Sequence, residues 1–220
     1  MPCRAVIVAL VGLSALLGLV SASNGARSAA PSYYVVRPDP RLCPSPLCGG
    51  HWVSLANQAR TRCHDGLFRP RCYVTRAVDV RREPLSSPWP EALARAEIAQ
   101  WEFEGPGVQK LGLLVVAEIW RPVGRPATGG FYRLRDTAVR CIRAPCFSFR
   151  GARLNGSLRV TLSDFDPGRV RASSDEIESA RTALASDTGL LASGRPVGTP
   201  HGGRVFSASR FYLRAALPRA

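Results

Sequence analysis

Apolar and polar residues alternate in several short stretches of this chain, as they do in half-buried strands. The clearest stretches are Cys72–Asp79 and Leu158–Asp166, and the segments Leu113–Trp120 and Arg204–Leu213 are also predicted as strands. Turn residues such as Pro167 and Gly168 follow or separate them. The pattern predicts strands that pair in antiparallel sheets.

Two other stretches follow a helical period. Their apolar positions are Ala94, Ile98 and Trp101 in the first, and Ile177, Ala180 and Leu184 in the second. Ser173 and Glu176, just before the second, have the spacing of a capping box, in which each side chain bonds the other's backbone N–H. The chain is therefore predicted to contain two helices.

The landmarks of the chain recur at a fixed distance. Tyr34, Arg37, Cys43, Cys48 and Asn57 are repeated 98 residues later as Tyr132, Arg135, Cys141, Cys146 and Asn155. Five positions in one register indicate two copies of one unit. With the elements above, the sequence predicts an α+β fold of two tandem β-β-β-α-β repeats, residues 33–126 and 127–217. Each repeat would hold one helix against antiparallel strands.

The N-terminus has the pattern of a secretory signal. Arg4 precedes an apolar run from Ala5 to Val20, and small residues follow up to Ala22. We expect a signal peptide at residues 1–22 and a linker at residues 23–32. A membrane anchor is the alternative, but it needs about 20 apolar residues and this run has 16. No later segment is apolar enough to span a membrane, so the mature chain is expected to be soluble. The signal peptide predicts that it is exported, to the periplasm or the medium.

Six cysteines follow the expected signal peptide: Cys43, Cys48, Cys63, Cys72, Cys141 and Cys146. An even number in an exported chain indicates disulfides. The repeat favours Cys43–Cys48 and Cys141–Cys146, which leaves Cys63–Cys72. A metal site is the alternative, but it needs four ligands, and only His51 and His64 lie near cysteines in the sequence.

The chain is strongly basic, with 30 Lys and Arg against 16 Asp and Glu, and Lys110 is its only lysine. Genome base composition is the simplest explanation of arginine without lysine. The charge nevertheless attracts anionic partners such as envelope lipids, acidic polysaccharide or extracellular DNA. The basic residues are scattered and form no compact nucleic-acid-binding signature, so we expect no specific nucleic-acid binding.

Candidate catalytic residues each have a structural explanation. The sequence contains neither a Gly-x-Ser-x-Gly turn nor a glycine-rich phosphate loop. His51 lies in an alternating segment, which is typical of a structural histidine, and His201 lies in a glycine turn. The acidic pairs are Asp164 with Asp166 and Glu102 with Glu104, and both are typical of solvated strand ends. We expect no catalytic, cofactor-binding or metal-binding residue, and no cofactor.

One loop is a candidate for binding. A Cys141–Cys146 disulfide would present Arg143 on a rigid bump, and protease inhibitors use such pre-organised loops. A loop of this length is tight for a protease cleft, and the first copy has no basic residue there. The sequence favours a non-enzymatic binding or structural module for an anionic envelope polymer or a protein partner. A protease inhibitor acting through Arg143 and a hydrolase with an unrecognised site are the alternatives.

Two segments resemble known proteins. The run Tyr33-Tyr-Val-Val-Arg-Pro-Asp-Pro-Arg-x-Cys43-x4-Cys48-Gly-Gly resembles the opening of a family of exported bacterial domains of unknown function. The later Arg140-Cys-Ile-Arg-Ala-Pro-Cys-Phe-Ser-Phe149 is similar to its second landmark, and the resemblance covers roughly Tyr33 to Leu213. It implies export and disulfides, and it brings no activity or site residue.

Overall fold

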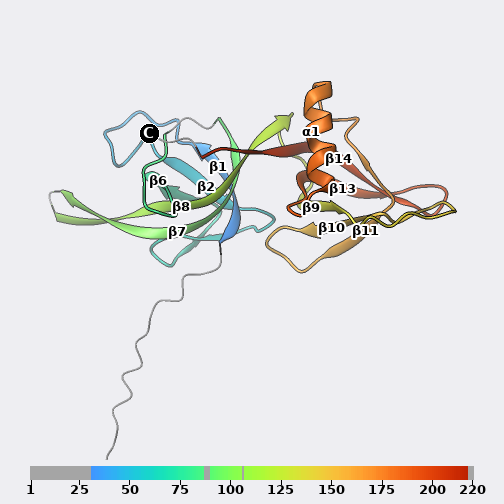
Figure 1. Cartoon of the computed structure of the whole chain (residues 1–220). Helices are drawn as coiled ribbons and strands as arrows, with labels where there is room; N and C mark the ends of the chain where they lie inside the picture. Colours follow the sequence, from blue (N-terminus) through green and yellow to red (C-terminus); the bar gives the residue numbers. More distant parts are fainter. Residues whose placement is uncertain (1–30, 87–89, 106, 218–220) are drawn as a thin grey trace, which may run out of the picture.

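The computed structural model describes residues 31–86, 90–105 and 107–217. The expected signal peptide at residues 1–22 and most of the expected linker at residues 23–32 lie outside this part of the chain. Two lobes lie side by side (Figure 1), the first lobe at residues 32–124 and the second lobe at residues 130–213. Within the described residues, no helix has the length and apolarity that a membrane crossing requires.

One mostly antiparallel sheet of twelve strands runs through both lobes, with the main order β11-β10-β9-β13-β14-β8-β7-β1-β2-β5. The first lobe contributes β1 (Ser32–Pro38), β2 (His51–Leu55), β5 (Cys72–Val74), β6 (Arg76–Asp79), β7 (Ala92–Gly105) and β8 (Gly107–Gly124). The second contributes β9 (Gly130–Asp136), β10 (Phe149–Arg153), β11 (Arg159–Leu162), β12 (Asp164–Asp166), β13 (Leu190–Gly198) and β14 (Arg204–Ala215). The short strands β6 and β12 pair in parallel with β8 and β14, respectively. Two further strands, β3 (Thr61–Arg62) and β4 (Phe68–Arg69), form a separate hairpin.

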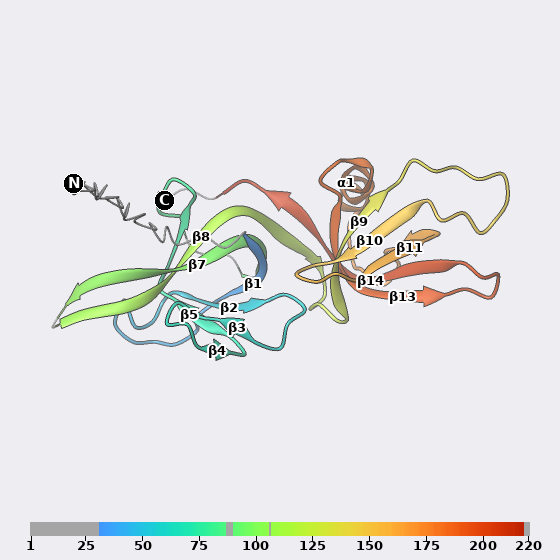
Figure 2. The same ribbon diagram turned by 90° about the horizontal axis from the view of Figure 1, so that it is seen from below.

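The predicted α+β fold with one helix in each repeat is wrong. The protein is mostly β, and α1 (Ser174–Ala185) is the single helix of the described residues. Residues 94–101, expected as a helix, belong to β7, which forms a long hairpin with β8 that projects from the first lobe (Figure 2). Ala94 and Ile98 are four residues apart, a spacing that fits a strand as well as a helix. Ala92, Ala94 and Ala96 pack into the same core, so the true period is two.

The second predicted helix is present as α1, and its start is the predicted capping box. The Ser173 hydroxyl accepts from the Glu176 backbone N–H at 3.3 Å, and the Glu176 carboxylate accepts from the Ser173 N–H at 3.0 Å. Ala180 and Leu184 are the buried residues of the helix. The predicted unit has no strand between its helix and its last strand, but β13 lies there, so the predicted order of elements is incomplete.

Buried side chains form three clusters on the two faces of the sheet. One core fills the first lobe around Val36 and Leu114, and a second lies between α1 and the sheet of the second lobe. The third cluster, which we call the junction cluster, consists of Tyr33, Ala56, Leu93, Trp120, Leu154, Leu191 and Tyr212. Leu93 alternates with Ala92 and Ala94, so the junction cluster lies on the opposite face from the first core. The lobes meet over it.

Two asparagines bind the lobes to each other across this junction. The Asn57 side chain donates to the carbonyls of Phe131 (2.7 Å) and Leu154 (2.9 Å), and accepts from the Phe131 N–H (2.8 Å). Asn155 makes the mirrored set, donating to the carbonyls of Tyr33 (2.7 Å) and Ala56 (3.0 Å) and accepting from the Tyr33 N–H (2.9 Å). Both have positive φ, 65° and 51°, which asparagine tolerates. We call this pair the asparagine clasp.

Three disulfides join Cys43 to Cys48, Cys63 to Cys72 and Cys141 to Cys146, with Cα–Cα distances of 5.4, 5.4 and 5.5 Å. These are the pairs that the repeated spacing predicts. Cys63–Cys72 lies within the first core. The other two close the first disulfide loop (residues 39–50), between β1 and β2, and the second disulfide loop (residues 137–148), between β9 and β10.

Candidate functional site

Four arginines lie on one face of β9, β10 and β11. The strand register places Arg135 directly opposite Arg150, and in the next row Ala152 separates Arg133 from Arg159. Arg133 and Arg135 flank Leu134, which is fully buried in the core beneath α1. Because side chains alternate along a strand, the arginines lie on the outer face, away from the helix. We call Arg133, Arg135, Arg150 and Arg159 the arginine patch.

Most of the charge in the arginine patch is uncompensated. Arg135 pairs with Asp187 at 2.9 Å, but both side chains are exposed, and such a pair contributes little. Arg159 donates to the backbone carbonyls of Gly156 and Leu158, and within the described part of the chain no carboxylate lies within 4 Å of the Arg150 guanidinium. Like charges directly opposite on neighbouring strands repel. A bound anion would relieve that repulsion.

The inner end of the arginine patch is anchored at the lobe junction. The Arg133 guanidinium lies 5.5 Å from the centre of the Tyr33 ring and donates to its hydroxyl. Tyr33 comes from β1 of the other lobe and belongs to the junction cluster. A cation held over an aromatic ring loses less conformational freedom when it binds a ligand. Contact between the lobes therefore fixes one corner of the patch.

The four arginines line a shallow groove of about 550 Å³, with Asp136 and Thr137 at one end. Arg140 holds both oxygens of the Asp136 carboxylate, at 3.0 and 2.8 Å. These hydrogen bonds lower the pKa of Asp136 below its usual range, so the carboxylate stays ionised and Arg140 compensates its charge. The net charge of the groove lining therefore comes from the arginine patch.

The second disulfide loop continues from this end of the groove and exposes apolar side chains. Ile142 is 103% exposed, Val139 49% and Phe147 40%. Arg143, singled out from the sequence, is also exposed. Its guanidinium is thus open to solvent on a loop that adjoins the arginine patch.

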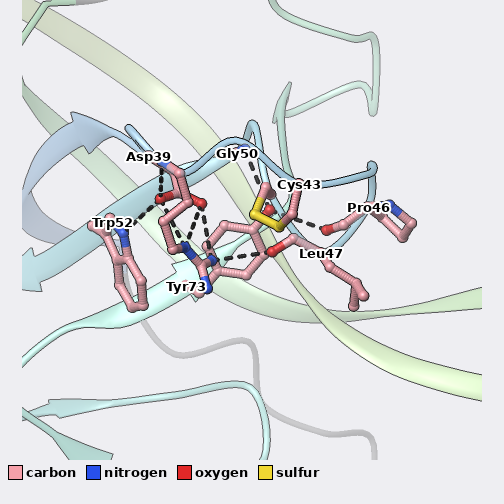
Figure 3. Close-up of polar contacts among 9 residues, drawn as sticks. Asp39, Cys43, Pro46, Leu47, Gly50, Trp52 and Tyr73 are labelled. Carbon is pink, nitrogen blue, oxygen red and sulfur yellow. Dashed lines mark hydrogen bonds and ion pairs between the residues drawn. A yellow bond between two sulfur atoms is a disulfide. The ribbon is translucent and has the colours of Figure 1, made fainter.

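In the first disulfide loop, Arg41 binds groups of the protein itself (Figure 3). The buried Asp39 carboxylate accepts from the Arg41 guanidinium at 3.0 Å and from the Trp52 indole N–H at 3.1 Å. The Arg41 guanidinium lies 5.0 Å from the ring centres of Trp52 and Tyr73, and it donates to the Leu47 carbonyl. Hydrogen bonds from Arg41 lower the pKa of Asp39. The charges of Asp39 and Arg41 therefore compensate each other, and both residues have a structural role in this loop.

Comparison with known proteins gives the family. Residues 32–217 match the profile of DUF6748, described as a domain of unknown function. The chain belongs to the DUF6748 family. The matched segment includes both lobes, the asparagine clasp and the arginine patch. Neither the curated proteins nor the solved structures contain a match.

The histidines of this DUF6748 domain lie apart from the arginine patch. His51 is buried in β2, and burial lowers the pKa of its imidazole. The His64 Nε2 atom lies 3.1 Å from the Lys110 carbonyl oxygen, and His201 is exposed in the turn between β13 and β14. In the described part of the chain, no three His, Cys, Asp or Glu residues are grouped so that they could hold a metal ion.

The acidic pairs of the DUF6748 domain lie on two different strands. Asp164 and Asp166 are exposed in β12, and each accepts from a nearby backbone N–H, that of Phe165 at 2.8 Å and that of Gly168 at 2.8 Å. Glu102 is exposed in β7, the strand that also contains Glu104. The bonds to Asp164 and Asp166 fix the turn at the end of β12.

Sequence reasoning missed the arginine patch because it treated the arginines as scattered. The one local signal is Arg133-Leu-Arg135, in which alternate positions of a strand carry the charge. Arg150 and Arg159 join this pair only through the register of β9 with β10 and of β10 with β11. That register is a long-range property that the local pattern does not contain.

Proposed function

We propose that this domain is a non-catalytic, exported binding module whose arginine patch binds phosphate and related anionic groups of the cell envelope. The observation that carries the proposal is the pairing of Arg135 with Arg150 on adjacent strands, with Arg133 and Arg159 in the next row. Only Arg135 among them pairs with a carboxylate of the described residues. The protein supplies the cations and leaves their counter-charge to a ligand.

The shape of the groove favours a polymeric or surface-bound ligand over a small molecule. Neighbouring strands are about 4.8 Å apart, and alternate residues of a strand about 6.8 Å, so the guanidinium groups can meet several anionic groups at once. Arginine binds phosphate oxygens through two parallel N–H donors, which suits this role better than lysine would. The overall charge of +14 adds long-range attraction.

Retention of the mature protein on phosphocellulose in rising salt tests this proposal. The double variant Arg150→Gln/Arg159→Gln is expected to elute at clearly lower salt, and the dependence of log K on log salt should become shallower by about one for each arginine lost. The matched control is Arg60→Gln/Arg81→Gln, which removes the same charge from exposed positions of the first lobe. Equal shifts in both variants would mean that only net charge matters, and the proposal would fail.

A second candidate is inhibition of a trypsin-like protease through Arg143. Its exposure, on a loop closed by Cys141–Cys146 and braced by the Asp136–Arg140 pair, favours this function. The mature protein should then slow hydrolysis of a chromogenic arginine substrate by trypsin, Arg143→Ala should abolish the effect, and Arg150→Gln should retain it. Rapid cleavage after Arg143 without inhibition would exclude this function.

We also propose that the two lobes are copies of one unit, residues 33–126 and 127–217, and that residues 1–22 direct export. The strand orders β5-β2-β1-β7-β8 and β11-β10-β9-β13-β14 support the first proposal, as does the 98-residue distance between Asn57 and Asn155. Three disulfides support an oxidising compartment. Mass spectrometry of the protein from the envelope or medium should find a chain that begins after Ala22, and an intact Met1 in exported material would contradict the signal peptide.

A further inference from the structure

Exposed apolar side chains border the arginine patch at both ends. Ile142, Val139 and Phe147 lie on the second disulfide loop, and Leu158, 46% exposed, directly precedes Arg159 at the opposite end. Single exposed apolar residues are common on soluble proteins. Here, however, they lie on the segments that follow β9 and precede β11, the strands that carry three of the four arginines of the patch.

The second disulfide loop holds its apolar residues outward. The Cys141–Cys146 disulfide closes the loop, the Asp136–Arg140 ion pair braces one side, and Thr137 donates through both its N–H and its hydroxyl to the Ser148 carbonyl. Ile142 is therefore presented on a braced loop, and its full exposure is a property of the folded chain.

We propose that the domain docks on an anionic lipid bilayer, with the arginine patch against the lipid phosphates and Ile142 inserted among the first carbons of the acyl chains. This proposal rests on the proposed function and names the partner of the same site. Arginines near an anionic membrane surface are attracted to it. An apolar side chain gains free energy only where it can leave water. A soluble phosphate polymer has no apolar region that Ile142 could enter. The headgroup boundary of a bilayer has both phosphate groups for the arginines and acyl chains for Ile142.

The first disulfide loop provides a control within the same chain. Leu42 is 102% exposed, as Ile142 is, and also lies beside a disulfide. Its neighbour Arg41 is bound by Asp39 and lies over the rings of Trp52 and Tyr73, so its charge is compensated. If exposure alone caused membrane binding, Leu42 and Ile142 would contribute equally.

Co-sedimentation of the mature protein with lipid vesicles tests the proposal. Vesicles of phosphatidylcholine with phosphatidylglycerol should bind the protein, and vesicles of phosphatidylcholine alone should not. Ile142→Ser should weaken binding to the anionic vesicles about tenfold, which corresponds to the transfer of one aliphatic side chain, and leave retention on phosphocellulose unchanged. Leu42→Ser should change neither measurement, and Arg150→Gln/Arg159→Gln should weaken both.

A second readout reports the position of the loop directly. Bromine on the acyl chains quenches tryptophan fluorescence, so the Ile142→Trp variant should lose more fluorescence on brominated vesicles than the wild-type protein does. The loss of the wild type serves as the control for quenching of the native tryptophans. Equal binding of Ile142→Ser, Leu42→Ser and wild type to anionic vesicles would overturn the membrane proposal. If retention on phosphocellulose still depended on the arginine patch, the proposed function would stand. If neither measurement depended on the patch, both proposals would fail.

Discussion

Replacement of Asn155 by glycine tests how the two lobes are held together. The side chain of Asn155 makes three hydrogen bonds, with the Tyr33 N–H, the Tyr33 carbonyl and the Ala56 carbonyl. Its φ of 51° is one that glycine adopts without steric cost. Asn155→Gly therefore removes the three bonds and leaves the backbone conformation accessible.

The expected loss of stability follows from the groups left behind. Tyr33 and Ala56 are 9% and 2% exposed, so water does not readily replace the lost partners. The Tyr33 carbonyl keeps a bond from the Ala56 N–H, which leaves one donor and one acceptor without a partner. At about 1–3 kcal/mol for each of these two buried groups, we expect the variant to lose about 2–6 kcal/mol of unfolding free energy. Asn155→Ala should lose a further 1 kcal/mol or so, because alanine is strained at this φ.

Equilibrium unfolding in urea, with the disulfides intact and tryptophan fluorescence as the signal, measures the effect. Trp120 lies in the junction cluster beside these residues, so its emission reports separation of the lobes. The control is Gln58→Ala, which removes an exposed hydrogen bond to the Asn155 carbonyl and should cost less than about 0.5 kcal/mol. If Asn155→Gly cost no more than Gln58→Ala, the clasp would not hold the lobes together.

Three further predictions concern local features. Asp39→Asn should reduce the dependence of the unfolding free energy on pH in acid. The native pKa of Asp39 is lowered, so the stability that Asp39 contributes is present above the ordinary carboxyl pKa of about 3.9 and is lost as pH falls below it towards the native pKa. Urea unfolding at a series of acidic pH values measures this, and a variant with the same pH dependence as the wild type would contradict it. Ser173→Ala should cost about 1 kcal/mol by removing the cap of α1, measured by urea unfolding, with no loss refuting the cap's role. Gly194→Ala should cost more than 1 kcal/mol or so in thermal melts, because its Cβ would lie 2.3 Å from the Ser207 carbonyl oxygen, whereas Gly198→Ala meets no atom within 4 Å and should be nearly neutral; equal melting temperatures would refute the close packing.

Local sequence patterns predicted much of the β structure and missed the part that depends on pairing. The capping box at Ser173 and Glu176 is a short-range signal, and α1 begins where it predicts. The β7 segment looked helical because Ala94 and Ile98 fit both periods, and its pairing with β8 decides between them. β13 contains Gly194 and Pro196 and has no clean alternation, yet it lies between β9 and β14 in the sheet. Its identity as a strand comes from these neighbours.

The candidate site was less accessible from the sequence than the fold. Asn57 and Asn155 were visible as a repeated landmark, but their bonds to the opposite lobe depend on the meeting of β8 and β14. The arginines of the patch come from three strands, and only the register makes Arg135 and Arg150 neighbours. Arg143 was singled out because a disulfide encloses it, and that signal led to the loop beside the patch.

The central position of β14 also means that the sheet cannot be completed until the end of the chain is present. β14 is the last strand in the sequence, yet it lies in the middle of the sheet, between β13 and β8, and Ala215 and Leu217 pack against the first core. When the chain is made from its N-terminus onwards, the edge of β8 from Ile119 to Gly124 has no strand partner until Arg210–Ala215 has been synthesised and can pair with it. Such an edge is a template for aberrant strand addition. Truncation before residue 210 should therefore yield aggregates instead of a stable isolated first lobe, because the last strand of the chain covers the open edge of β8.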